Sequence, residues 1–111
     1  MEMVNYPKRD EVWLIALDPS RGAEIKKTRP CLVISPDDMN EPLQTVLVAP
    51  MTTTQRSYVT RVNLSFRNKA GQVALDQLRA VARERLIRKL GVVSANAADS
   101  VSSVLVEMFT R

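Results

Sequence analysis

Residues 45–49 read Thr-Val-Leu-Val-Ala, a run that is apolar on both faces of an extended chain. A strand of this kind lies in the middle of a sheet, because other parts of the protein cover both of its faces. Two apolar runs precede it, at residues 12–17 (VWLIAL) and 31–35 (CLVIS), and a proline follows each within two residues. Proline ends a strand because it has no N–H to donate to a ladder. We therefore expect three strands, with residues 45–49 in the central one.

The sequence after residue 49 predicts further strands. Residues 50–58 form a polar connection, and residues 60–66 (TRVNLSF) then alternate between apolar and polar side chains. Such alternation is typical of a half-buried strand, here with Arg61, Asn63 and Ser65 on its wet, basic face. The remaining expected elements are a strand at 72–78, a helical turn at 83–86 and a final strand near 91–93.

The last part of the chain predicts a helix. Ser94 is suited to the N-cap, because its hydroxyl can accept from an unpaired amide of the first turn. The apolar residues that follow at helical spacing are Ala98, Val101, Val104, Leu105 and Met108. The predicted fold is mainly β with a C-terminal α-helix, in which a small, strongly curved antiparallel sheet or partly open barrel packs on the helix. We expect one domain over residues 1–111.

Composition excludes several kinds of catalysis. The 111 residues include no histidine and one cysteine, which excludes histidine-based triads, histidine acid–base pairs and imidazole metal sites. We predict no metal and no cofactor. Cys31 lies in an apolar run and is expected to be buried rather than reactive. No signal peptide or membrane-spanning stretch is recognisable, so we expect a soluble protein of the cytoplasm.

Charge is distributed unevenly along the chain. Sixteen Lys and Arg residues stand against twelve Asp and Glu residues. The first fifty residues carry six basic and eight acidic side chains, whereas residues 51–111 carry ten basic and four acidic ones. A basic second half suggests an anionic partner such as a nucleic acid. The alternative is that these charges only keep a small protein soluble.

Two polar clusters adjoin the predicted strands. Residues 26–30 (KKTRP) place three cations ahead of a strand, and the proline restricts Arg29 to an extended conformation. An arginine held in this way can bind a phosphate through two parallel hydrogen bonds. The alternative is a structural ion pair with Glu24. Residues 52–54 are all threonine, and their hydroxyls either belong to a site or cap a turn.

The longest motif of the sequence is an ordered series of short runs. It comprises VWL at 12–14, DPSRGAE at 18–24, KTRPCLVISP at 27–36, VLVAPMTT at 46–53 and GQVALDQ at 71–77. This series resembles the MazF/PemK family of toxin endoribonucleases over essentially the whole chain. The resemblance implies a homodimer of SH3-like barrels that cleaves single-stranded RNA, including mRNA, at short sequences and arrests growth. It also implies a cognate antitoxin that neutralises the toxin and binds DNA together with it.

The resemblance implies a catalytic role for Arg29 and Thr52. The implied reaction is attack of a ribose 2′-hydroxyl on the adjacent phosphorus, which leaves a 2′,3′-cyclic phosphate and a 5′-hydroxyl and needs no metal. In this reaction Arg29 stabilises charge on the phosphoryl oxygens and Thr52 donates a hydrogen bond to one of them. The general base is left open, because an arginine with a pKa above about 12 is a poor base at neutral pH.

Further site residues follow from the same resemblance. Ala74 stands where some members carry an arginine, so we expect Arg29 and Thr52, rather than Asp76, to carry the chemistry. The supporting or substrate-binding candidates are Glu24, Lys27, Thr53, Gln55, Arg56, Asp76 and Gln77. The candidate contacts to the RNA backbone are Arg61, Arg83 and Arg85.

Two other functions are compatible with a fold of this kind. CcdB-type toxins share it, bind DNA gyrase and cleave nothing, but the pairing of Arg29-Pro30 with Thr52 favours the ribonuclease. An SH3-like adaptor would need an aromatic peptide groove, for which five aromatic residues are few.

Overall fold

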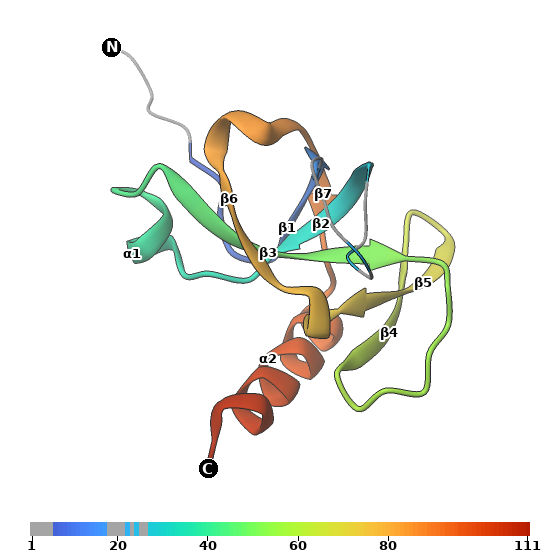
Figure 1. Cartoon of the computed structure of the whole chain (residues 1–111). Coiled ribbons are helices and arrows are strands. Elements are labelled where there is room, and N and C mark those ends of the chain that lie inside the picture. The colour runs from blue at the N-terminus through green and yellow to red at the C-terminus, as the bar shows by residue number, and fades with distance from the viewer. Residues whose placement is uncertain (1–5, 18–21, 23, 25–26) are drawn as a thin grey trace.

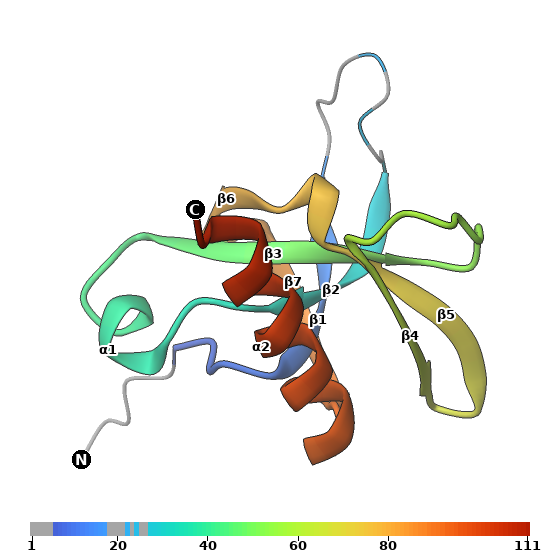
Figure 2. The ribbon, with the colours of Figure 1, turned by 90° about the horizontal axis from the view of Figure 1, so that it is seen from below.

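The computed structural model describes residues 6–17, 22, 24 and 27–111 of the chain (Figure 1). These residues form a strongly curved antiparallel sheet, an open half-barrel, with one long helix lying across it (Figure 2). The fold class predicted from the sequence is confirmed. The strands are β1 (Glu11–Ala16), β2 (Thr28–Val33), β3 (Thr45–Thr52), β4 (Arg61–Phe66), β5 (Lys69–Ala74), β6 (Arg79–Ala82) and β7 (Leu86–Val92). The helices are α1 (Asp37–Asn40), α2 (Ala95–Phe109) and the 3-10 turns η1 (Leu75–Gln77) and η2 (Arg83–Arg85).

The central position of β3 is confirmed. The strand order is β4-β5-β3-β2-β1-β7, and β6 also pairs with β3. One edge of β3 pairs with β2. The other edge pairs with β6 over Thr45–Val48 and with β5 at Met51 and Thr52. The strand therefore runs on through Pro50, and the expected polar connection from residue 50 is wrong at its start. Pro50 is tolerated because it lies where the second edge changes partner and no N–H is needed.

Several other boundaries differ from the prediction. β2 begins at Thr28 rather than at residue 31, which places Arg29 inside the strand. The strand expected at 72–78 is instead the end of β5, then η1, and β6 was not predicted. β7 is longer than expected. The sequence showed only its end, because two register shifts in its pairing with β1 break the alternation that marks a strand. The short helix α1, where only a strand end was expected, is a further difference.

The prediction for the C-terminal helix is confirmed. The Ala97 N–H donates to the Ser94 hydroxyl oxygen at 3.2 Å, so Ser94 caps α2. Val101 is buried, and the predicted apolar face of α2 packs on a core that includes Leu32, Ala49 and Val73. A second core occupies the other side of the sheet, where it includes Cys31 and neighbouring β3 side chains. Successive residues of β2 thus enter different cores, as expected for a strand covered on both faces.

Cys31 is fully buried, as predicted. Burial raises the pKa of its thiol to about 12, although Arg79 and Arg29 lower that pKa in part. A thiol with so high a pKa is not a nucleophile at neutral pH. Among the helices of residues 6–17, 22, 24 and 27–111, none is long and apolar enough to cross a membrane.

Candidate functional site

Arg29 and Thr52 lie at neighbouring ends of two paired strands. Cys31 of β2 pairs with Pro50 of β3 in antiparallel register. Continuing this register by two residues brings Arg29 opposite Thr52, and both residues line the same pocket. The structure therefore brings together the two clusters that the sequence singled out.

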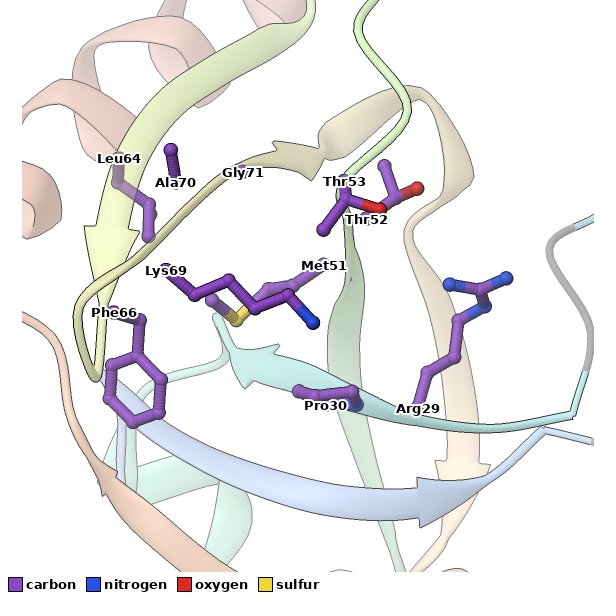
Figure 3. Close-up of a pocket in the computed structure, with 10 residues that line it drawn as sticks. All are labelled: Arg29, Pro30, Met51, Thr52, Thr53, Leu64, Phe66, Lys69, Ala70 and Gly71. Atoms are coloured by element: carbon purple, nitrogen blue, oxygen red, sulfur yellow. The ribbon is translucent and has the colours of Figure 1, made fainter.

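The pocket between these strand ends has an apolar floor and a polar rim. Figure 3 shows the Arg29 guanidinium and the Lys69 amine approaching the opening from opposite sides, with Thr52 and Thr53 beside it. The floor is formed by the apolar side chains of Pro30, Met51, Leu64 and Phe66. Two cations above an apolar floor suit a ligand that combines anionic groups with flat apolar ones.

Lys69 is a pocket residue that the sequence reasoning missed. It is the first residue of β5 and pairs with Phe66 across a two-residue hairpin turn. The turn residues Arg67 and Asn68 both have positive φ, at 52° and 62°, as in a type I′ turn. Such turns usually contain glycine, which is absent here, so the hairpin left no clear signal. The only available signal was the run of basic residues without an acidic one before residue 70.

The Thr52 hydroxyl is held in place by its own turn. The Thr54 N–H donates to Thr52 Oγ1 at 3.1 Å, and Thr52 is 8% exposed. A hydroxyl can accept through two lone pairs and still donate its proton. Of the two alternatives for the threonine hydroxyls, turn capping is observed at Thr52, and it leaves the hydroxyl proton able to bind a ligand.

Gly71 lets β5 come close to Thr52. A Cβ atom on Gly71 would lie 2.9 Å from the Thr52 carbonyl oxygen, a separation that real Cβ atoms do not show. Glycine is therefore required at this position by close packing of two strands. The next residue, Gln72, pairs directly with Thr52.

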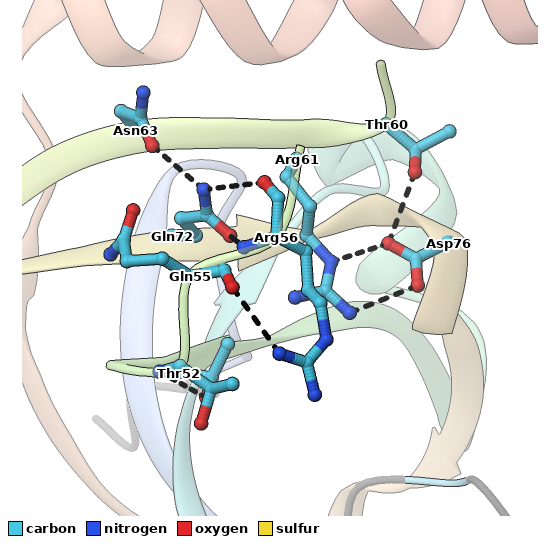
Figure 4. Close-up of polar contacts among 9 residues, drawn as sticks. Thr52, Gln55, Arg56, Thr60, Arg61, Asn63, Gln72 and Asp76 are labelled. Atoms are coloured by element: carbon cyan, nitrogen blue, oxygen red, sulfur yellow. Dashed lines mark hydrogen bonds and ion pairs between the residues drawn. The ribbon is translucent and has the colours of Figure 1, made fainter. Parts of the chain in front are cut away.

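The loop after β3 is attached to the sheet by the Gln72 side chain. Its Oε1 accepts from the Arg56 N–H at 3.1 Å, and its Nε2 donates to the Arg56 carbonyl at 3.1 Å and to Asn63 Oδ1 at 2.9 Å (Figure 4). The side chains of Gln55 and Arg56 are exposed on this loop, and Arg56 Nη1 donates to the Gln55 carbonyl at 3.3 Å.

Asp76 lies outside this pocket, in a polar cluster with Arg61. Arg61 Nε contacts Asp76 Oδ1 at 2.7 Å, Arg61 Nη2 contacts Oδ2 at 3.2 Å, and the Thr60 hydroxyl donates to Oδ1 at 3.1 Å (Figure 4). The hydrogen bonds from Arg61 lower the pKa of Asp76 below its usual value, which outweighs the effect of partial burial. The Arg61 side chain is only 8% exposed. The predicted wet face of β4 is confirmed at Asn63 and Ser65, which are exposed, and is wrong at Arg61, whose guanidinium binds Asp76.

Glu24, Asp76 and Gln77 share a second hollow, which Pro50 and Arg79 also line. Pro50 lies two positions before Thr52 in β3, so the second hollow and the Arg29–Thr52 pocket are lined by nearby residues of the same strand. Arg79 was not predicted, and the charges of Arg79 and Arg29 both reach Cys31. Glu24, Asp76 and Gln77 therefore do not line the Arg29–Thr52 pocket but lie in a hollow near it.

Lys27 immediately precedes β2, and its carbonyl accepts from the Leu17 N–H at 3.0 Å. The Lys27 backbone has a φ of 72°, in the left-handed region. Lys26, the first cation of the cluster at residues 26–30, lies outside the described residues.

Arg83 and Arg85 donate to backbone carbonyls. Arg83 Nη1 lies 3.1 Å from the Leu43 carbonyl, and Arg85 Nη1 lies 3.2 Å from the Ala16 carbonyl. Arg83 follows the residue that pairs with Thr45, at the opposite end of β3 from Thr52. The structure therefore does not bring Arg83 to the pocket. Within the described part of the chain, no group of three His, Cys, Asp or Glu side chains could hold a metal ion.

Comparison with known proteins gives a match over nearly the whole chain. A family described as the PemK-like, MazF-like toxin of type II toxin–antitoxin systems matches residues 8–109. Endoribonuclease MazF9 of Mycobacterium tuberculosis is 36% identical over 98 residues, which cover 79% of this chain and 83% of the relative. The endoribonuclease toxin MazF of Escherichia coli K12 is 34% identical over 86 residues, 77% of each chain.

Solved structures show the same fold. The crystal structure of MazF from Deinococcus radiodurans has a TM-score of 0.84 and 24% identity, and the match covers 97% of this chain and all 100% of the other. A mycobacterial endoribonuclease in complex with its cognate antitoxin has a TM-score of 0.77 and 22% identity, with coverage of 91% and 92%.

Proposed function

Because the chain belongs to the PemK-like, MazF-like family of toxins of type II toxin–antitoxin systems, we propose that it is a sequence-specific endoribonuclease that cleaves single-stranded RNA without a metal. The observation that carries the proposal is the convergence of Arg29 and Thr52 on one pocket at paired strand ends. Two relatives of similar length are named endoribonucleases, which supports the same activity.

The proposed reaction is transfer of the phosphodiester to the neighbouring ribose hydroxyl. The 2′-oxygen bonds to phosphorus as the bond from phosphorus to the 5′-oxygen breaks, so one product ends in a 2′,3′-cyclic phosphate. The 2′-hydroxyl proton leaves to a base, and the departing 5′-oxygen gains a proton to become a hydroxyl. Arg29 stabilises the charge that grows on the phosphoryl oxygens. The Thr52 hydroxyl donates to one of them while its oxygen accepts from Thr54 N–H.

Recognition of the RNA requires unpaired bases. An A-form duplex hides the edges that distinguish its bases, so a single strand splayed over the pocket is the proposed substrate. The Lys69 amine lies on the rim where a second phosphate of such a strand would pass (Figure 3). The aromatic ring of Phe66 offers a stacking surface for one base. The hollow with Glu24, Asp76 and Gln77 extends the surface past Pro50.

The proposed partners are a second copy of the chain and a cognate antitoxin. An antitoxin with an acidic segment would cover the cationic rim formed by Arg29 and Lys69 and exclude RNA. The toxin would act on mRNA in the cytoplasm, stop translation and growth, and bind DNA only together with the antitoxin.

The test is digestion of a long, unstructured RNA of mixed sequence in the presence of EDTA. We expect cuts at a short recurring sequence, new 5′-hydroxyl ends and cyclic phosphates at the other ends. Arg29→Ala should abolish cutting, and Arg29→Lys should restore only part of it, because a lysine lacks the two-pronged donor geometry. An Arg29→Ala protein that is folded and fully active would refute the site. No cleavage together with inhibition of DNA gyrase would favour the CcdB-type alternative.

A further inference from the structure

Gln72 is a buried polar side chain that the proposed chemistry does not use. It is 4% exposed, in a strand whose next two residues, Val73 and Ala74, are fully buried. A buried amide is tolerated when its hydrogen bonds are made. Gln72 makes three: its oxygen accepts one and its nitrogen donates two.

Two of these three bonds go to the main chain of one residue. Gln72 Oε1 accepts from the Arg56 N–H and Gln72 Nε2 donates to the Arg56 carbonyl, both at 3.1 Å. The side-chain amide thus binds Arg56 as a neighbouring strand would, and the interaction does not depend on the Arg56 side chain. The third bond, to Asn63 Oδ1 of β4, fixes the orientation of the amide.

The two hydrogen bonds between the Gln72 side chain and the Arg56 main chain, here called the clamp, hold the middle of an exposed loop. Residues 53–59 are all exposed, and the loop is fastened near its start by the Thr54 N–H bond to Thr52 and near its end by the Arg61 N–H bond to the Tyr58 carbonyl. Gln72 supplies the tie between these points. Because Gln72 also pairs with Thr52 in the ladder, one buried residue connects the reactive strand end with the loop.

We propose that Gln72 is a positioning residue for RNA recognition, which acts through the Arg56 main chain to hold the side chains of Gln55 and Arg56 in one arrangement on the loop that follows Thr52. This inference rests on the proposed ribonuclease function. A loop that is ordered before binding costs less entropy to bind, and its fixed contacts discriminate between sequences. A loop without the clamp adapts to more sequences and binds each less tightly. Arg29 and the Thr52 hydroxyl stay in place, so the chemical step changes little.

The test compares Gln72→Met with two variants of β4. Gln72→Met keeps the length and burial of the side chain and removes all three hydrogen bonds. Asn63→Ala removes only the third, and Ser65→Ala changes an exposed residue of the same strand face. Steady-state kinetics use a short RNA that carries the sequence preferred by the wild type, and the cuts in a mixed-sequence RNA are mapped for each variant.

We expect Gln72→Met to raise KM about tenfold, the effect of one or two lost hydrogen bonds, with kcat nearly unchanged and with additional sequences cut. Asn63→Ala should raise KM less, and Ser65→Ala should match the wild type. Combining Gln72→Met with Arg56→Ala should add little to the loss from Arg56→Ala alone, because both act through the same loop. An unchanged KM and cleavage pattern in folded Gln72→Met would overturn the inference. A fall in kcat alone would also overturn it.

Two further measurements keep the test decisive. Amide hydrogen exchange should show the Arg56 N–H protected in the wild type and exposed in Gln72→Met, a readout that needs no RNA. If Gln72→Met does not fold, Gln72→Val, a residue favoured in strands, takes its place with the same expected results. A wild type that cuts no RNA would refute the proposed function, whereas a cutting wild type with an unprotected Arg56 amide would refute only the clamp.

Discussion

At the scale of single residues, removing the Thr52 hydroxyl has the clearest expected effect on the rate of cleavage. Loss of one hydrogen-bond donor to a developing oxyanion typically lowers kcat about 10²–10³-fold. Thr52→Val keeps the shape of the side chain and removes the donor, so a loss of this size is expected, whereas Thr52→Ser should retain most activity. Thr54→Ala is the control, since it keeps the N–H that binds Thr52 Oγ1. Equal activity of the valine and serine variants would show that the hydroxyl has no part in the reaction.

At the same scale, the Asp76–Arg61 pair predicts a pH-dependent contribution to stability. The pKa of Asp76 is lowered in the folded protein, chiefly by hydrogen bonds from Arg61, while an unfolded Asp has a pKa of about 3.9. The contribution is therefore fully present above that unfolded value and is lost as pH falls through the lower folded value. Asp76→Asn should be less stable than the wild type near neutral pH.

The measurement is denaturant unfolding of both proteins from neutral pH down to about pH 3. The difference in free energy of unfolding between wild type and Asp76→Asn should shrink toward the acid end. Exposed Asp38 on α1 provides the control variant, Asp38→Asn, for which no such convergence is expected. A wild-type advantage that stayed constant at all these pH values would contradict the role of the ion pair.

At the scale of elements, the close approach of β5 to β3 places Thr52. Gly71→Ala would put a Cβ atom 2.9 Å from the Thr52 carbonyl oxygen, and a backbone atom cannot give way as a flexible side chain can. We expect the two strands to separate locally at this point. The rate of RNA cleavage should fall strongly, and the melting temperature should fall only modestly. Ser65→Ala on the neighbouring strand should change neither. Full cleavage activity in Gly71→Ala would show that Thr52 does not need its present position.

The same elements show what the sequence could predict. Regular features were readable: the two-sided apolar β3, the alternation of β4, and the capped, one-sided α2. β7 was mostly missed because bulged pairing with β1 removes a regular period. Arg29 and Thr52 stood out as parts of polar clusters beside predicted strands, and the family motif supplied their roles. The position of Lys69 depended on a hairpin turn whose residues, Arg67 and Asn68, carry no glycine signal. Hydrogen bonds between a strand and a loop sixteen residues away, such as those of Gln72 with the Arg56 main chain, have no local sequence signature.

At the scale of the whole molecule, four basic residues of the second half differ in where they lie relative to the pocket. Lys69 and Arg56 lie at the rim of the site or on its loop, together with Arg29 from β2. Arg61 is bound to Asp76, and Arg83 binds carbonyls at the far end of β3. Of these four, Lys69 and Arg56 are placed to contact the phosphates of an RNA bound at the pocket, whereas Arg61 and Arg83 are not.

This division can be measured through the salt dependence of RNA binding. For single strands the slope of log K against log salt changes by about 0.7 for each phosphate contact. Lys69→Ala and Arg56→Ala should each make the slope shallower by about that amount, whereas Arg83→Ala should leave it unchanged. Affinity is measured by titration of a short RNA with a 2′-deoxy group at the cleavage position, which prevents cutting, at several salt concentrations. A slope that falls equally in all three variants would mean that RNA binds to a diffuse basic surface rather than at this site.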